Sequence, residues 1–128
     1  MFAALILAEA GYSPLILERG KEMERRTADV DRFWKDGILD TESNVQFGEG
    51  GAGTFSDGKL TTGIKDFRIK KVLEEFVAAG AQPEILYKAK PHIGTDVLRE
   101  VVVNIRNKII SLGGEIRFES RATDFITD

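Results

Sequence analysis

The first twenty positions of the chain predict a helix followed by a short strand. Residues 2–10 are strong helix formers that are apolar on nearly every side, and Gly11 stands where such a helix would end. Residues 15–17 are a short apolar run that predicts a strand, and the acidic Glu18 follows directly. Because the helix is apolar on most faces, we expect it to lie inside a larger structure.

Apolar residues at three- and four-residue steps predict three more helices. We expect the charged side chains of the first of these to form a solvated face. Asp66 is expected to cap the second helix, and Thr95 or Asp96 the third. The predicted ranges are residues 21–35, about 66–79 and about 96–112.

Two of these helices carry long apolar stripes. The stripe of the second helix is expected to lie in the core, with Ile69, Val72, Leu73, Phe76 and Val77. The third and longest helix has the stripe Leu98, Val101, Val102, Ile105, Ile109 and Leu112.

The remaining segments predict short strands and loops. Residues 37–44 read as a loop and residues 45–47 as a brief strand that leads into a glycine-rich stretch. A strand is predicted over about 115–119, and residues 122–127 are expected to start another.

The order of helix, tight turn, buried strand and terminal acid matches the second half of a dinucleotide-binding βαβ unit. In such a unit, a glycine fingerprint opens the helix about twenty residues before the acid that binds a ribose hydroxyl. Counting back from Glu18 places that fingerprint at or before Met1, so we expect the chain to begin inside a nucleotide-binding fold. The alternative is an ordinary αβ unit whose acid is only solvated.

Composition narrows the choice of function. The chain has 128 residues, is 42% hydrophobic and 30% charged, and carries a net charge of -3, so we expect no nucleic-acid or membrane partner. Without cysteine it has no disulfide and no thiolate, and its single histidine, His92, excludes a histidine cluster. Residues 1–10 lack the basic leader of a secretion signal, and the expected location is cytoplasmic.

The glycine-rich stretch 48–60 is the segment most suited to holding a ligand. Its bare backbone N–H groups can approach a pyrophosphate, a sugar edge or a flavin ring, although a flexible connector would have the same composition. Residues 48–53 satisfy GxGxxG, but a true fingerprint should open a helix. Residues 53–59 match the start of a Walker A loop, but Leu60 stands where a magnesium-binding Ser or Thr belongs.

The sequence predicts structural rather than catalytic roles for several other polar residues. Ser56 and Asp57 lie in a glycine turn, where such side chains usually form turn hydrogen bonds. His92 reads as a structural hydrogen-bonding residue rather than a general base. Glu74 and Glu75 are adjacent on a helix and therefore point to different faces.

Three segments together resemble a known family. Residues 7–20, 43–60 and 90–96 resemble the FAD-dependent dehydrogenases that are often called NAD(FAD)-utilizing dehydrogenases. The similarity spans nearly the whole chain. That family belongs to the glutathione-reductase-like flavoproteins, which implies a fold with two dinucleotide-binding domains and FAD held in an extended conformation. The resemblance implies an α/β fold over residues 1–128, namely a partial FAD/NAD(P)-binding Rossmann-like domain that lacks its first strand and glycine fingerprint.

The resemblance also implies roles for particular residues. Glu18 would bind the adenosine ribose of FAD, and Arg19 would flank it. The strand that begins at Glu115 would join the nucleotide-binding sheet, and Ala122 onward would begin a β-meander. The residues implied along the pyrophosphate and flavin are Gly50, Gly51, Ala52, Gly53, Thr54 and Ser56, with Lys59 nearby.

We therefore expect a fragment of an FAD-dependent oxidoreductase, in which the flavin transfers electrons to or from a small-molecule substrate. The catalytic residues are not assigned, no metal is expected, and NAD(P)H is a candidate electron donor in the intact parent. Alone, the fragment is expected to be inactive. Two alternatives remain: a non-catalytic interaction module that self-associates through an exposed sheet edge, and, less favoured, a P-loop-like nucleotide-binding protein.

Overall fold

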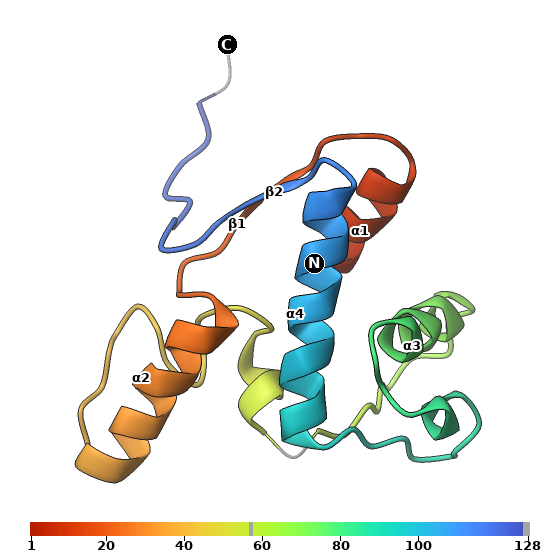
Figure 1. Ribbon diagram of the computed structural model, residues 1–128, viewed down its shortest axis with the longest axis horizontal. Helices are drawn as coiled ribbons and strands as arrows, with labels where there is room; N and C mark the ends of the chain where they lie inside the picture. Colours follow the sequence, from red (N-terminus) through yellow and green to blue (C-terminus); the bar gives the residue numbers. More distant parts are fainter. Residues whose placement is uncertain (57, 127–128) are drawn as a thin grey trace.

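A computed structural model describes residues 1–56 and 58–126 of the chain. Asp57 and Thr127, which entered the predictions above, lie outside the described residues. The described part is a mixed α/β structure of helices and one pair of strands, with the strands along the upper side in Figure 1. Its elements are α1 (Phe2–Glu9), β1 (Leu15–Leu17), α2 (Met23–Asp36), η1 (Ala52–Phe55), α3 (Arg68–Ala78), η2 (Pro83–Leu86), α4 (Thr95–Ser111) and β2 (Glu115–Arg117).

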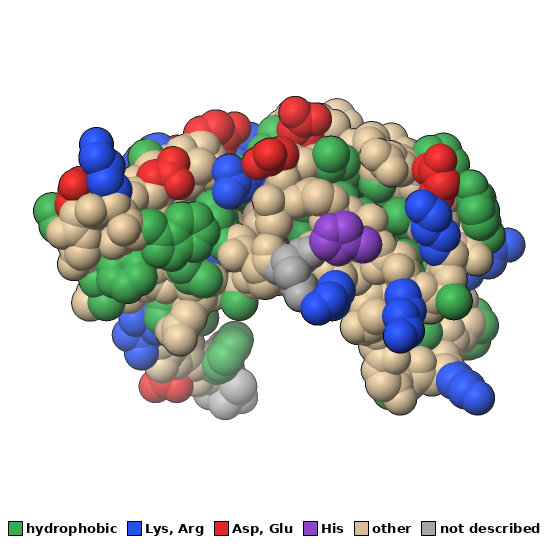
Figure 2. Space-filling model, turned by 90° about the horizontal axis from the view of Figure 1, so that it is seen from below, with side chains coloured by type: hydrophobic (Ala, Val, Ile, Leu, Met, Phe, Trp, Pro, Cys, Tyr) green, Lys and Arg blue, Asp and Glu red, His purple; other side chains and the backbone are tan. Residues whose placement is uncertain are grey.

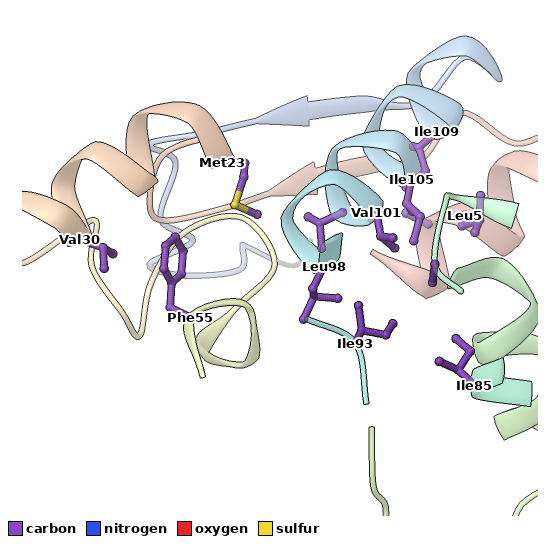
Figure 3. Close-up of a cluster of buried hydrophobic side chains, with 13 residues drawn as sticks. Leu5, Met23, Val30, Phe55, Ile85, Ile93, Leu98, Val101, Ile105 and Ile109 are labelled. Atoms are coloured by element: carbon purple, nitrogen blue, oxygen red, sulfur yellow. The ribbon is translucent and has the colours of Figure 1, made fainter. Parts of the chain in front are cut away.

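Helix α4 runs through the middle of the molecule and supplies much of the core. It contacts α1, α2, η1 and β2 (Figure 1). Its apolar residues recur on one side, which faces the other buried side chains, and each stabilises the fold by about 1.5–3 kcal/mol when fully buried (Figure 3). Leu112 is the exception, with 42% of its surface exposed. The buried members of the predicted stripe are Leu98, Val101, Val102, Ile105 and Ile109.

Strands β1 and β2 pair in parallel, which places two segments about one hundred residues apart in sequence side by side. Ile16 lies opposite Ile116 in the register, and both are half-buried. The ladder extends beyond the strands, since the backbone N–H of Glu18 donates to the carbonyl of Arg117 at 2.9 Å. The strand predicted near Glu115 is therefore present, and it joins β1. The wider Rossmann-like sheet stays a prediction.

Two predicted strands are absent from the described residues. Residues 122–126 have no regular structure, and their apolar side chains find no partner, since Phe125 is 85% and Ile126 96% exposed. Residues 45–47 form bends rather than a strand, because the Val45 carbonyl accepts a hydrogen bond from the buried Arg26 and the Phe47 carbonyl accepts one from the Asn44 N–H. Within the described residues neither segment pairs with a neighbouring strand, so both strand predictions were wrong there.

The predicted helix starts need small corrections. Gly94, rather than Thr95 or Asp96, occupies the cap position of α4. Phe67 occupies the cap position of α3, although the Asp66 carboxylate still accepts a hydrogen bond from the Arg68 backbone N–H at 2.8 Å. Asp66 therefore helps to satisfy the first turn of α3 from one position earlier than a standard cap.

The apolar stripe of α3 is only partly buried, so the prediction that it lies in the core was too strong. Leu73, Phe76 and Val77 pack against the edge of the core, and the Phe76 ring meets Phe2 edge-on at 5.3 Å between centroids. The buried residue of this helix is Glu75. Its neighbour Glu74 points away, as the sequence predicted.

Helix α1 is also less buried than predicted. Ala4, Leu5 and Ala8 face the core, but Ile6 is 55% and Leu7 44% exposed. Hydrophobic side chains gather as well on the end of the molecule that α2 forms (Figure 2).

Candidate functional site

A cavity of about 410 Å³ opens beside the carboxyl end of β1. The strands, the start of α1, helices α3 and α4, and the glycine-rich loop all contribute to its lining. Polar groups lie mainly on the loop side, so the cavity combines an apolar body with a polar edge, as small-molecule sites usually do. Its apolar walls include Phe2, Ile16, Phe76, Val102, Ile116 and Phe118.

Most of the predicted cofactor-binding residues meet in this cavity although thirty or more residues separate Glu18 from the loop. Three other predicted residues, Arg19, Ala52 and Ser56, are not part of its lining. Ser56 instead donates its hydroxyl to the carbonyl of Gly53 at 2.9 Å, which is the turn role that its context predicted. The predicted residues that line the cavity are Glu18, Gly50, Gly51, Gly53, Thr54 and Lys59.

Glu18 connects the end of β1 to the beginning of the glycine-rich loop. Its Oε1 accepts hydrogen bonds from the backbone N–H groups of Gly20 at 2.8 Å and Gly48 at 3.0 Å. Both bonds use the same carboxylate oxygen. The second oxygen, Oε2, can therefore accept a hydrogen bond from a ligand without releasing the loop.

The close contact between strand end and loop depends on Gly20. A Cβ placed on Gly20 would come within 2.6 Å of the Gly48 backbone, a distance that real Cβ atoms do not tolerate. The loop therefore begins in direct contact with the end of β1, and this contact brings the following glycines to the cavity.

Arg19 does not line the cavity, and its predicted place beside the ribose stays a prediction. Its Nε and Nη2 donate to the two carboxylate oxygens of Glu42 at 2.6 and 2.9 Å, and its guanidinium lies 4.0 Å from the centroid of the Phe47 ring. The Arg19 guanidinium hydrogen bond lowers the pKa of Glu42. Arg19 thus holds the outer loop in place, outside the cavity.

Glycine residues leave the loop backbone bare where it borders the cavity. Gly50 has a φ of 84°, in the left-handed region, and a Cβ there would collide with Thr54 Oγ1. At Gly51 and Gly53 a Cβ would meet nothing within 4 Å, so open space adjoins the backbone at both positions. A ligand can therefore approach the peptide groups at these positions closely.

The surroundings of Lys59 differ from those of a Walker A lysine. Lys59 forms an isolated antiparallel bridge with His92, and residues 60–67 contain no helix in the described chain. A Walker A lysine instead opens a helix. The GxGxxG at 48–53 likewise leads only into the four-residue η1. His92 is exposed on the surface of the molecule (Figure 2).

Arg26 is a structural residue of the site that the sequence prediction missed. The charges of α2 were expected on a solvated face. Arg26 is instead fully buried, and Asp29 is only 8% exposed. The spacing of Met23, Arg26 and Val30 places the arginine on the buried face of the helix, which is the signal that could have revealed it.

Arg26 organises the segment that precedes the glycine loop. Its guanidinium donates to the carbonyls of Asn44 at 2.9 Å, Val45 at 3.0 Å and Gly48 at 3.3 Å, and also to that of Glu49. The guanidinium also lies 4.7 Å from the centroid of the Phe55 ring. Burial lowers the pKa of Arg26 to about 10.

Glu49 is the second residue of the site that the sequence prediction missed. Its Oε2 accepts hydrogen bonds from the backbone N–H of Met23 at 2.7 Å and from Arg106 Nη1 at 2.8 Å. Burial raises the pKa of this carboxyl, and the Met23 and Arg106 contacts oppose that rise. An acid among glycines gives no periodic signal, and its burial follows only from the packing of α2 against α4.

Comparison with known proteins finds a much longer relative. A protein of Clostridium beijerinckii with the name "Uncharacterized protein" is 60% identical over 121 residues. The match covers 94% of this chain and 23% of that relative, so the chain spans about a quarter of the relative's length. No protein-family model matches the chain.

Two structural features bear on membranes and metals, namely the length of the helices and the grouping of acidic and histidine side chains. Among the described residues, no helix combines the length and the apolar character that crossing a membrane requires. Across residues 1–56 and 58–126, no three acidic or histidine side chains come together as a metal site.

Proposed function

We propose that this chain is part of the FAD-binding domain of a flavin-dependent oxidoreductase. The observation that carries the proposal is the convergence of Glu18 and the glycine-rich loop on one apolar-walled cavity. In a dinucleotide site, an acid at the end of a strand binds the ribose and a glycine-rich backbone approaches the pyrophosphate. Glu18 and the glycine-rich loop, which are thirty residues apart in sequence, would supply these two elements. The resemblance to FAD-dependent dehydrogenases rests on the same two segments.

The residues of the cavity suit the parts of FAD. Glu18 Oε2 would accept hydrogen bonds from ribose hydroxyls, and the backbone at Gly51 and Gly53 would face the pyrophosphate. Apolar walls such as Phe118 would cover part of the flavin or adenine ring. When bound, the flavin supplies the redox chemistry, and the protein supplies binding, orientation and exclusion of water.

Electron transfer on a small-molecule substrate is proposed for the longer protein, with NAD(P)H as the candidate electron donor. A P-loop-like function is less favoured, since Lys59 forms a strand-like bridge instead of opening a helix.

Ligand-dependent stability tests the proposal directly. Thermal unfolding of this chain should shift upward with excess FAD, because a ligand at one hundred times its dissociation constant stabilises by about 2.7 kcal/mol. ATP with magnesium serves as the comparison. Stabilisation by ATP with magnesium and none by FAD would contradict the flavin proposal and favour the P-loop alternative.

A variant of the strand-end acid sharpens this test. Glu18→Gln keeps one oxygen for the Gly20 and Gly48 N–H groups but removes the charge that strengthens a ribose hydrogen bond. We expect FAD affinity to fall about tenfold, or about 1.4 kcal/mol, in a fluorescence titration. Glu115→Gln, an exposed carboxylate on the neighbouring strand, is the matched control and should bind FAD normally. If the Glu18→Gln variant and the unaltered chain bind FAD with equal affinity, Glu18 does not contact the ribose.

A second candidate function is a non-catalytic interaction module. Its support is the outward side of β1, where Leu15 is 49% and Leu17 48% exposed, together with the exposed side of α1. A strand with apolar side chains and an edge unpaired within the described residues is a template for association.

A further inference from the structure

Two buried oxygen atoms of the glycine-rich loop have no hydrogen-bond partner in the described part of the chain. They are Oε1 of Glu49 and Oγ1 of Thr54. Glu49 is 3% and Thr54 1% exposed, and both residues line the cavity. A buried polar atom without a partner costs about 1–3 kcal/mol, so two such atoms in one loop require an explanation.

The neighbours of these oxygen atoms restrict where they can lie. The Glu49 carboxyl is fixed through its other oxygen, which the Met23 N–H and Arg106 both contact. Thr54 lies in η1, and Gly50 covers its hydroxyl so closely that no Cβ would fit. The two oxygens belong to a built site rather than to mobile surface side chains.

The chemistry of the pair selects one kind of ligand group. A carboxylate oxygen repels a phosphate but accepts a hydrogen bond from a hydroxyl group, and a threonine hydroxyl both donates and accepts. Because its pKa is raised, the Glu49 carboxylate is more basic and so a stronger acceptor. Phosphate finds a better environment at the bare backbone of Gly51 and Gly53.

We propose that Glu49 Oε1 and Thr54 Oγ1 form a subsite for hydroxyl groups of the bound cofactor, namely those of the ribityl chain that joins the flavin ring to the phosphates. This assignment rests on the proposed function and adds a recognition element to it. The two atoms gain in the complex the hydrogen bonds that they lack in the free chain. Glu49 becomes a ligand-binding residue in addition to its contacts with α2 and α4.

Threonine variants separate this subsite from a structural role. Thr54→Val keeps the shape of the side chain and removes the unpartnered hydroxyl, so the free chain should keep or slightly raise its melting temperature. FAD affinity should nevertheless fall about tenfold, because a buried ligand hydroxyl loses its partner. Thr54→Ser, which keeps the hydroxyl, should bind FAD within about threefold of the unaltered chain. Glu49→Gln should weaken FAD in the same way as Thr54→Val.

Two smaller probes locate the subsite along the cofactor. Riboflavin carries the ribityl chain without phosphate, and ADP carries the pyrophosphate without ribityl. We expect Thr54→Val to weaken riboflavin about tenfold and to leave ADP binding unchanged. The reverse pattern would place the pair at the ADP half of the cofactor and overturn the ribityl assignment.

The failures of the two proposals are distinguishable. If the unaltered chain binds FAD while Thr54→Val and Glu49→Gln bind it equally well, the hydroxyl subsite is wrong and the proposed function stands. A lower melting temperature of free Thr54→Val would also overturn it, since the hydroxyl would then have a partner in the free chain. If the unaltered chain binds none of the three probes, the proposed function itself fails, and the subsite with it.

Discussion

Arg26 shows how a single buried cation can organise a loop that has no regular structure. Its guanidinium supplies donors to carbonyls of residues 44–49, which would otherwise be buried without partners. These backbone carbonyls offset part of the cost of burying the charge, and the nearby carboxylates of Glu18 and Glu49 also favour the charged guanidinium. The position of the glycine-rich loop therefore depends on one side chain of α2.

Replacing Arg26 should destabilise the whole chain. We expect Arg26→Met to lower the free energy of unfolding by about 3 kcal/mol, because it leaves several buried carbonyls unpaired. Arg26→Lys should recover only part of that loss, since an ammonium lacks the planar fork of donors. Urea unfolding measures the free energy of unfolding of both variants.

The matched control is Arg25→Met, which removes a surface ion pair between the half-exposed side chains of Arg25 and Glu119. This variant should lower the free energy of unfolding by less than about 1 kcal/mol. Equal effects at positions 25 and 26 would refute this role.

At the scale of elements, a network of charges joins three helices on the side away from the glycine-rich loop. Glu75 of α3 accepts hydrogen bonds from Lys71 and from Lys108 of α4, the latter at 2.9 Å. The same two lysines also contact Glu9 of α1, at 3.2 and 2.6 Å. The network replaces the apolar contact that the half-buried stripe of α3 does not provide.

This network makes stability depend on pH. Burial raises the pKa of Glu75, but the lysine hydrogen bonds outweigh it, and the pKa lies below its ordinary value of 4.5. The pKa of Glu9 is lowered as well, first by its hydrogen bond with Lys108. Because the folded pKa values are depressed, the contribution is present above the unfolded value and is lost as the pH falls through the folded value.

We expect Glu75→Gln to lower the free energy of unfolding at neutral pH by about 1–3 kcal/mol and to have a smaller effect at acidic pH, because the ionic contribution of Glu75 is lost as the pH falls through its lowered folded pKa. Urea unfolding at the two pH values measures the difference. Glu74→Gln, at the exposed neighbouring position, should have little effect at either pH. A penalty for Glu75→Gln that does not change with pH would argue against the ionic role of the carboxyl.

At the scale of the whole molecule, apolar surface remains exposed on the outer side of β1 and α1. On α1, Ile6 is 55% and Leu7 44% exposed. On β1, Leu15 is 49% and Leu17 48% exposed. A parallel sheet is normally covered on both faces, so this surface is suited to contact with further polypeptide.

We expect this surface to make the isolated chain self-associate. Light scattering during gel filtration should show a mass that rises with concentration, and the double variant Leu15→Lys, Leu17→Lys should shift the chain toward the monomer. The charges oppose edge-to-edge pairing without removing a fully buried side chain. Phe67→Lys, which changes a side chain that is 89% exposed at the start of α3, is the control and should not alter the mass. A monomer at all concentrations would contradict the association surface.

Local patterns in the sequence determined the helices, the strands at 15–17 and near 115, and the residues that could approach a ligand. The period of apolar positions and the glycines act over a few residues, so they can be read without knowing the fold. The tertiary structure alone decided which charges are buried. Glu49 and Glu75 are buried because segments far apart in sequence supply their partners, and no local pattern records such contacts, whereas Arg26 had a local signal in its helical spacing. The structure alone gives the geometry in which Glu18 and the glycine-rich loop line one cavity while Arg19 pairs with Glu42 outside its lining.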